Sequence, residues 1–266
     1  RGPLRLATTA IHRRGARELR GIDVNAPEGG IRPDPLAGPI TRVDAVARSA
    51  SNAVSVNLNL VKPERRLFVA ANYTWSRTTN ETDSPLSLAA DAGRVVDERG
   101  PAADDARHRA MGFASLPLGR GVTAGVSFMA RSALPYNVST GRDDNADGLI
   151  TDRPRGTTRN SARGGASADV GMRLSWRTGF GGAPAAPPTG PQVRIVRGGA
   201  DSNPLADMPG GAPTSRYGLE LLLQVFNALN RTNPTQFGGV MTSPFFGQPV
   251  AAGAPRRLEG GVRLTF

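Results

Sequence analysis

The chain has 266 residues, of which 38% are hydrophobic, with 33 Gly, 22 Pro, no Cys and a net charge of +11. The high Gly and Pro content argues against a helical protein, and no run of about 18 apolar residues offers a transmembrane helix. The lack of Cys excludes disulfides and thiolate metal sites. The basic residues are scattered rather than gathered on a helix or interleaved with aromatic side chains, so we expect no nucleic-acid partner.

Eight segments alternate apolar and polar residues, which is the pattern of a β-strand with two different faces. The alternation is sharpest where Ala168, Val170, Met172, Leu174 and Trp176 oppose polar neighbours. The predicted strands cover about residues 3–12, 42–61, 65–76, 108–116, 121–131, 167–177, 216–227 and 258–266.

The connections between these strands alternate in length. Tight turns are predicted at Lys62-Pro63-Glu64 and at Pro117-Leu118-Gly119-Arg120, whereas long polar loops cover about residues 13–41, 77–107, 132–166 and 228–256. Short turns at one end and long loops at the other are typical of outer-membrane barrels, and a soluble β-sandwich gives no reason for this agreement.

One connection departs from this rule. Residues 178–215 form a long Pro- and Gly-rich insertion on the side of the short turns, which we expect to be periplasmic. Val193, Ile195 and Val196 within it are compatible with a small extra strand.

The sequence therefore predicts an all-β fold, an antiparallel transmembrane β-barrel with long extracellular loops and short periplasmic turns. Its apolar face would contact outer-membrane lipid. The last strand ends with Val262, Leu264 and Phe266 on one face. We expect this tail to be the insertion signal that the barrel assembly machinery recognises.

Several motifs resemble the C-terminal barrel of TonB-dependent outer-membrane receptors, specifically the Oar-like group that carries a carboxypeptidase-regulatory domain. No single motif is specific, but their order and spacing together are. The motifs are Arg20-Gly21-Ile22-Asp23-Val24-Asn25-Ala26-Pro27, Arg32-Pro33-Asp34-Pro35, Tyr73-Thr74-Trp75-Ser76, Asp105-Ala106-Arg107-His108-Arg109, Pro135-Tyr136-Asn137 with Thr140-Gly141, Asp143 to Pro154, Arg159-Asn160-Ser161, Val225-Phe226-Asn227-Ala228-Leu229-Asn230 with Asn233, and Pro255-Arg256-Arg257.

The resemblance implies a barrel of about 22 strands around a plug, of which residues 1–266 are the C-terminal part. The family's plug domain and TonB box have no counterpart in this sequence, and the chain begins at Arg1 without a signal peptide. We therefore expect a longer precursor in the outer membrane of a Gram-negative bacterium. Its partners would be its own plug domain, the TonB complex and a ligand that the sequence does not identify.

A self-contained eight-stranded barrel that acts as an adhesin or anchor is the alternative, because eight strands can close. Hundreds of upstream residues with a plug would favour the receptor. A signal peptide directly before Arg1 would favour the small barrel.

The loop from Asp143 to Asp152 resembles the start of a calcium-binding loop. Oxygen ligands stand at positions 1, 3 and 5 and Gly148 at position 6, but Pro154 occupies the position of the usual bidentate Glu. An acidic surface loop whose side chains cap their own backbone is the other reading. If calcium binds as a structural ion, its ligands are Asp143, Asn145, Asp147, the Leu149 carbonyl and Asp152; no other cofactor is expected.

Two further groups of residues have predicted places in the barrel. Polar residues of the last strands would face the lumen and contact the plug or the wall, and aromatic residues near strand ends suit the girdles at the lipid headgroups. The lumen group is Asp169, Arg173, Arg177, Glu220 and Gln224, and the girdle group is Tyr73, Trp75, Trp176 and Tyr217.

Catalysis is not expected. His12 and His108 are the only histidines, and no nucleophile-elbow serine motif accompanies them. We interpret His108 as a hydrogen-bonded residue at the barrel rim.

Overall fold

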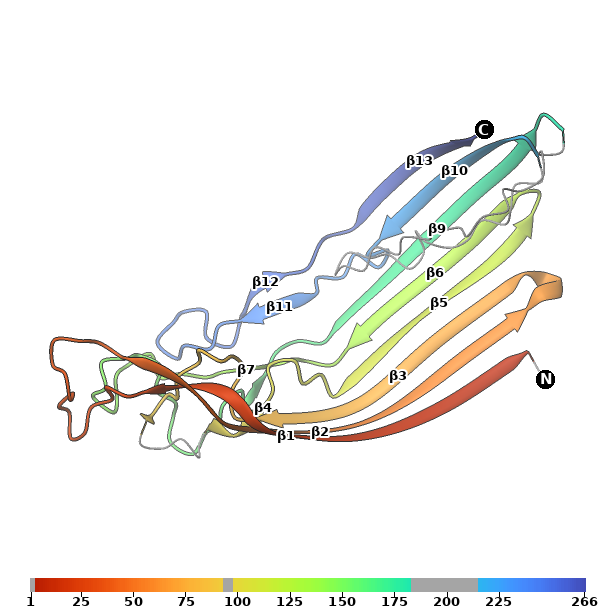
Figure 1. The fold of residues 1–266 in the computed structure, drawn as a ribbon. Coiled ribbons are helices and arrows are strands. Elements are labelled where there is room, and N and C mark those ends of the chain that lie inside the picture. The colour runs from red at the N-terminus through yellow and green to blue at the C-terminus, as the bar shows by residue number, and fades with distance from the viewer. Residues whose placement is uncertain (1–2, 93–97, 183–214) are drawn as a thin grey trace.

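One large antiparallel sheet makes up most of the molecule in a computed structural model, which describes residues 3–92, 98–182 and 215–266. Strands that follow one another along the chain lie side by side, in the order β1-β2-β3-β5-β6-β9-β10-β13, and the short β4 pairs with β3 (Figure 1). These strands are β1 (Leu4–Asp23), β2 (Thr41–Lys62), β3 (Leu67–Asn80), β4 (Gly100–Pro101), β5 (His108–Gly119), β6 (Val122–Arg131), β9 (Ser167–Phe180), β10 (Tyr217–Phe226) and β13 (Arg257–Thr265).

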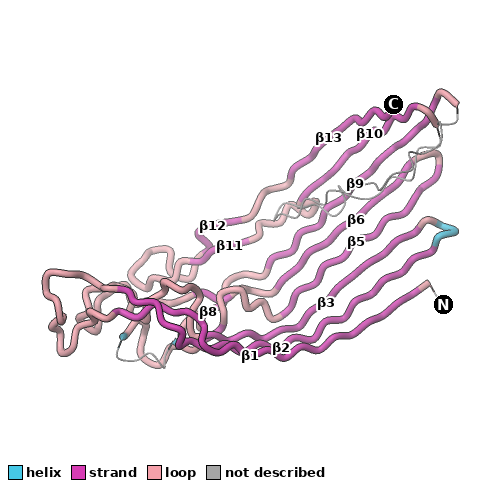
Figure 2. Tube along the Cα trace, viewed as in Figure 1, coloured by secondary structure: helices cyan, strands magenta, loops and turns pink. Residues whose placement is uncertain are grey.

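The two ends of the sheet differ, as the loop lengths predict. Both chain termini and the short turns lie at one end, which we call the turn end, and the long connections lie at the other, the loop end (Figure 1). A short 3-10 turn, Pro63–Arg65, joins β2 to β3 (Figure 2). Arg120 and Gly121 join β5 to β6 with φ values of 51° and 80°. Two successive positive φ angles are those of a type I′ turn, whose twist matches that of the flanking strands.

The described loops contain five short strands that the sequence did not predict. Besides β4, four of them form two small two-stranded sheets at the loop end, and each covers at most four residues. The pairs are β7 (Pro135–Tyr136) with β8 (Ala162–Arg163), and β11 (Pro234–Phe237) with β12 (Pro249–Ala252).

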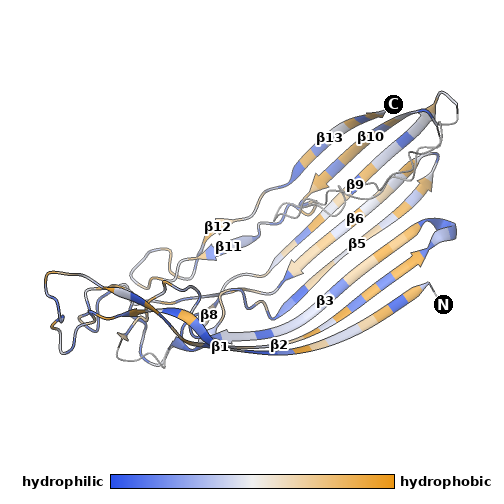
Figure 3. Cartoon of the chain, in the orientation of Figure 1, coloured by the Kyte–Doolittle hydropathy of each residue, from blue (hydrophilic) through white to orange (hydrophobic). Residues whose placement is uncertain are grey.

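The large sheet has one apolar and one polar face, because its register places like residues opposite one another. Figure 3 shows the alternation of hydrophobic and hydrophilic residues along the strands that underlies these faces. On the apolar face, Leu6, Leu58, Ala71, Gly112, Phe128 and Val170 form one continuous row across six strands. Residues of this face stay exposed: Leu221 and Leu223 are 41% and 48% accessible. An apolar face this large and open is what a lipid-facing barrel wall requires.

Side-chain hydrogen bonds link neighbouring strands on the polar face. Ser55 and Thr74 lie 2.9 Å apart, and Asn72 donates to Asn57 at 2.8 Å. Glu220 and Gln224 are each only 5% exposed, although they alternate with the exposed leucines of the same strand. The polar face is thus the more enclosed of the two, and we call it the inner face.

The sheet is not closed. Among the residues that the structure describes, the edge strands β1 and β13 pair only with β2 and β10. The same residues include no helix that is long and apolar enough to cross a membrane.

Eight strands were predicted and the described residues form eight long strands, but the predicted end of the first strand at residue 12 was wrong. β1 continues to Asp23 and pairs with β2 up to Thr41, so the connection is 24–40 rather than 13–41. The alternation of apolar and polar residues disappears after residue 12 because this part of the hairpin extends beyond the apolar band. A bulge between Gly15 and Glu18, with Arg17 at a φ of 58°, also interrupts the period of two.

Other boundaries also differ from the prediction. β3 continues to Asn80 rather than ending at about residue 76. β5 includes Pro117 to Gly119, so the second turn is shifted by about two residues, to Arg120-Gly121. β9 continues to Phe180 and β10 begins at Tyr217. Most of the predicted insertion, including Val193, Ile195 and Val196, lies outside the described residues.

Candidate functional site

The buried part of the chain lies largely at the loop end and is polar. Among the described residues, the buried hydrophobic side chains are only four alanines, Ala47, Ala90, Ala102 and Ala106. The buried polar ones include Asp105, Glu98, Arg159, Asn160 and Asn25. Such groups are stable without water only when they are hydrogen-bonded or paired, so the shape of the loops depends on these contacts.

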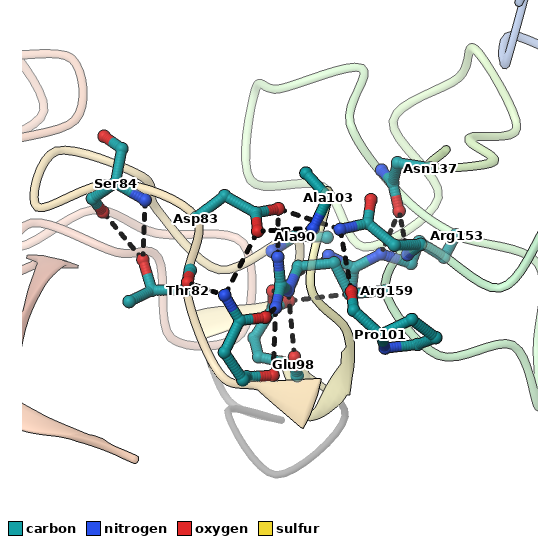
Figure 4. Close-up of polar contacts among 12 residues, drawn as sticks. Thr82, Asp83, Ser84, Ala90, Glu98, Pro101, Ala103, Asn137, Arg153 and Arg159 are labelled. Carbon is teal, nitrogen blue, oxygen red and sulfur yellow. Dashed lines mark hydrogen bonds and ion pairs between the residues drawn. The ribbon is translucent and has the colours of Figure 1, made fainter. Parts of the chain in front are cut away.

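A buried cluster centred on Arg159 joins the β3–β5 loop to the β6–β9 loop (Figure 4). The Arg159 guanidinium contacts the Asp83 carboxylate, donates from Nε to the Glu98 carbonyl at 3.0 Å and from Nη2 to the Asn80 carbonyl at 2.9 Å. Arg153 grips the Glu98 carboxylate with two parallel bonds of 2.7 and 2.9 Å (Figure 4). This bidentate geometry is the most specific that an arginine can offer a carboxylate.

A second buried ion pair connects the same two loops. Asp105, whose side chain has no exposed surface, accepts from Arg163 at 2.5 Å, from Arg107 at 3.1 Å and from the backbone N–H of Thr78 at 2.7 Å. Arg163 also donates to the Ala133 carbonyl at 3.2 Å, so the pair fixes the β7–β8 sheet against β3.

Both acidic centres are held ionised. Burial, the largest influence on the Asp83 carboxyl, raises its pKa, but hydrogen bonds from Arg159 and Asn160 outweigh burial, and the pKa falls below its ordinary value. The pKa of Asp105 is lowered in the same way: burial raises it, and bonds from Arg163 and the Thr78 amide more than offset that cost.

A cavity of about 320 Å³ lies beside this framework, lined by residues of the β6–β9 and β10–β13 connections. The rings of Tyr136 and Phe237 stack along it with centroids 5.6 Å apart, and Arg131 adds a cation at its edge. Gly164 is required there, because a Cβ at that position would meet the Phe237 ring at 2.5 Å. Aromatic surface with one cation, in a cavity of this size, suits a small ligand or one end of a larger ligand.

The β1–β2 hairpin tip reaches the predicted calcium loop. Asn25, 2% exposed, donates to the carbonyls of Asp34, Ala37 and Gly38, which folds the tip. Arg32 binds the Asp23 carboxylate at 3.3 Å and also donates to the Asp147 carbonyl. The motifs around Arg20 and Arg32 therefore have a structural role, which is to brace one loop against another.

The predicted calcium ligands lie together in one loop whose own amides bind them. Asp143 accepts from the Asp147 and Gly148 N–H groups, and Asp147 accepts from the Leu149 N–H at 2.7 Å. Asp152 Oδ2 accepts from the Asp144 and Asn145 N–H groups.

The charge of this loop affects Asp152. Burial, and then the negative charges of Asp147 and Asp143, raise the pKa of the Asp152 carboxyl above its ordinary value. In the described part of the chain, no group of three or more His, Cys, Asp or Glu side chains is arranged to hold a metal. A calcium ion here would thus need Asn145 and backbone carbonyls among its ligands, and calcium binding stays a prediction.

The residues predicted to face the lumen share the inner face, and three of them cluster. Glu220 pairs with Arg177 at 3.0 Å and with Arg173 at 3.5 Å, and Arg263 of β13 is 3.6 Å away. Gln224 lies opposite Arg173 and Glu259, and its buried Nε2 has no hydrogen-bond partner among the described residues. Asp169 is on the same face but exposed, and it makes no ion pair with a described residue.

The residues of the predicted girdles lie on the apolar face near its two ends. Tyr73 and Trp75 are near the loop end, where the Tyr73 hydroxyl and His108 Nδ1 are 2.7 Å apart. Trp176 and Tyr217 are near the turn end, where Tyr217 stacks on Phe180 with centroids 5.6 Å apart. The rows of Trp75 and Trp176 are about ten residues apart along β9, which at about 3.3 Å per residue and a tilt of about 45° spans about 23 Å. That is close to the height of a transmembrane barrel's apolar band.

Val262 and Leu264 also lie on the apolar face, 68% and 65% exposed, and Phe266 follows β13 at 97%. The ionic framework of Asp83, Glu98 and Arg159 was not predicted. The only available signal was a set of opposite charges in two long loops, and such a set does not specify which charges pair.

A comparison with solved structures finds a protein with a similar fold. The chain is similar to the outer membrane transporter YddB from Escherichia coli, with a TM-score of 0.59 over 98% of this chain and 30% of that chain, at 9% sequence identity. No family model and no curated protein matches the chain. At this identity the likeness concerns the fold alone: the chain has the all-β, antiparallel fold of part of an outer-membrane barrel wall, and it spans about 30% of that transporter's length.

Proposed function

We propose that this chain is part of the barrel wall and external loops of an outer-membrane TonB-dependent receptor of the Oar-like group, in a Gram-negative bacterium. The observation that carries the proposal is an open, two-faced sheet whose fold matches 30% of the chain of an outer membrane transporter. The braced loops and the cavity beside Tyr136 and Phe237 supply a place for ligand capture. Binding and energised import need no covalent chemistry, and none is assigned to the chain.

The polar groups of the inner face are suited to contacts with a plug domain inside this wall. One carboxylate, Glu220, has three arginines within 3.6 Å, and the buried amide nitrogen of Gln224 lacks a partner in the described residues. We assign this surface to contacts with the plug domain, which the TonB complex would move during import. The apolar face contacts lipid, and the tail ending in Phe266 is the signal for the barrel assembly machinery.

The open edges weigh against the alternative of a self-contained eight-stranded adhesin or anchor. A barrel of eight strands must pair β1 with β13, and these strands do not pair in the structure. Unpaired strand edges are costly in lipid, so both edges need further strands.

The test is uptake by cells that carry the intact gene. Ferric chelates, oligosaccharides and peptides would be supplied separately to cells with the gene, without it, and with the inner-membrane energy complex inactivated. We expect one ligand class to accumulate only when the gene and the energy complex are both present, and Phe237→Ala to reduce that accumulation at equal protein level. Accumulation that persists without the energy complex would contradict a TonB-dependent receptor.

A further inference from the structure

The apolar face ends abruptly toward the loops on β1, β2 and β3. Val54 lies opposite Trp75 in the last apolar row. One row further on the same face, His12, Asn52 and Arg77 lie opposite one another. A row of basic and polar groups therefore follows directly on the aromatic row.

A second cavity of about 320 Å³ lies at this boundary. Asn52 and Arg77 line the cavity on the sheet, and Ala50 and Thr79 line it one row nearer the loops. Arg99, the residue directly before β4, completes the lining. His12 Nδ1 lies 2.7 Å from Asn52 Oδ1, which fixes the Asn52 side chain in place. The site is thus built from two strands and one loop, with His12 of β1 holding Asn52, and not from a single mobile side chain.

The two arginines differ from those of the loop framework. Arg153 and Arg159 lie against the buried Glu98 carboxylate, and Arg163 pairs with the buried Asp105 carboxylate. Within the described ranges, neither Arg77 nor Arg99 has an ion pair or a side-chain hydrogen bond, so the cavity holds two guanidinium groups without an acidic partner. An anion is the ligand that such a cavity favours, and the guanidinium fork matches the oxygens of a phosphate.

We propose that this cavity binds a phosphate group in the headgroup of a lipid. Arg77 is two residues from Trp75 on the same face of β3, so a phosphate bound there lies at headgroup height. The acyl chains of the same lipid would then lie against Val54, Trp75 and the apolar rows below them. The inference rests on the proposed placement in the outer membrane, but it concerns the lipid-facing surface and not the transport path.

The test compares lipid binding by the intact protein, purified in detergent, with two matched double variants. Arg77→Gln/Arg99→Gln removes the two site cations, and Lys62→Gln/Arg65→Gln removes two cations at the turn end. The probes are bisphosphorylated lipid A, the same lipid after enzymatic removal of its phosphates, and inorganic phosphate as a competitor. Heat-dependent migration on gels reports folding for each variant.

We expect lipid A to bind the site variant at least about tenfold more weakly than it binds the wild type, and the turn-end variant with unchanged affinity. Removing the lipid's phosphates should weaken binding to the wild type by a similar factor, which needs no variant to fold. The proposal is overturned if lipid A binds the site variant as tightly as it binds the wild type, or if the dephosphorylated lipid binds the wild type as tightly as lipid A does. Displacement of the lipid by inorganic phosphate would show a free-anion site instead. None of these results depends on uptake, so a negative result in lipid binding does not contradict the transport proposal, which the uptake experiment tests separately.

Discussion

At the scale of single residues, Asp105 is a buried side chain that holds two of the loops together. It is fully buried and holds Arg163, Arg107 and the Thr78 amide. Asp105→Asn leaves the Arg163 guanidinium without its anionic partner, so we expect a local cost of about 3 kcal/mol. Hydrogen exchange of the β7 and β8 amides should then accelerate about a hundredfold.

The control for Asp105 is an exposed ion pair. Arg42 and Asp44 lie 2.8 Å apart with side chains 61% and 30% exposed, so Asp44→Asn should cost less than about 1 kcal/mol. Equal acceleration in both variants would show that burial of Asp105 contributes nothing.

The lowered pKa values of Asp83 and Asp105 predict how the loops respond to acid. A carboxyl whose pKa is lowered by folding contributes stability that is fully present above its unfolded pKa of about 4. That stability is lost as the pH falls from there through the lowered pKa. Loop exchange, corrected for its intrinsic pH dependence, should be constant from pH 8 to about 5 and rise below about 4. A rise already near neutral pH would contradict this assignment.

In the loop around Asp147, unlike at Asp83 and Asp105, the pKa of a carboxyl is raised rather than lowered, and this bears on calcium binding. Asp143, Asp147 and Asp152 repel one another, which is part of why the pKa of Asp152 is raised, and a cation would relieve that repulsion. Calorimetric titration of the refolded barrel with calcium should give a heat that Asp147→Ala removes. A titration without such a heat, or with the same heat from the variant, would exclude this site.

At the scale of the elements, the short strand β4 packs against the β6–β9 loop with no space between the backbones. A Cβ on Gly100 would lie 1.9 Å from the Arg159 carbonyl oxygen, so Gly100→Ala must displace one of the loops. We expect a cost of about 1–3 kcal/mol, visible as a lower urea midpoint. Gly218→Ala in β10 is the control, because its nearest atom, Thr265 Cβ, is 3.6 Å away. Identical midpoints for the two variants would contradict this packing.

The elements also separate what could be predicted from what could not. Strands within the apolar band, such as β9 and β10, follow from alternation because their residues lie in turn on the apolar and the polar face. The far half of β1 could not be predicted, since it lies beyond the apolar band and has no apolar face. The contact of Arg159 with Asp83 joins residues 76 positions apart, and no local pattern records such a contact.

At the scale of the whole molecule, the wall has a defined orientation in the membrane. The apolar band of about 23 Å lies between the turn end and the loop end, and the loop end should face the outside of the cell. Charge and composition did not predict this arrangement; the alternation of short and long connections did. The side of the membrane on which each end lies can be measured directly.

That measurement is labelling of single cysteines introduced into these 266 residues, which contain no Cys of their own. Leu36, 98% exposed, lies in the β1–β2 connection at the loop end, and Glu64 lies in the turn between β2 and β3. On intact cells that produce the full protein, a membrane-impermeant maleimide should label Leu36→Cys at once and Glu64→Cys only after the outer membrane is permeabilised. Labelling of Glu64→Cys on intact cells, with Leu36→Cys protected, would contradict the orientation, and labelling of both would contradict a membrane-spanning wall.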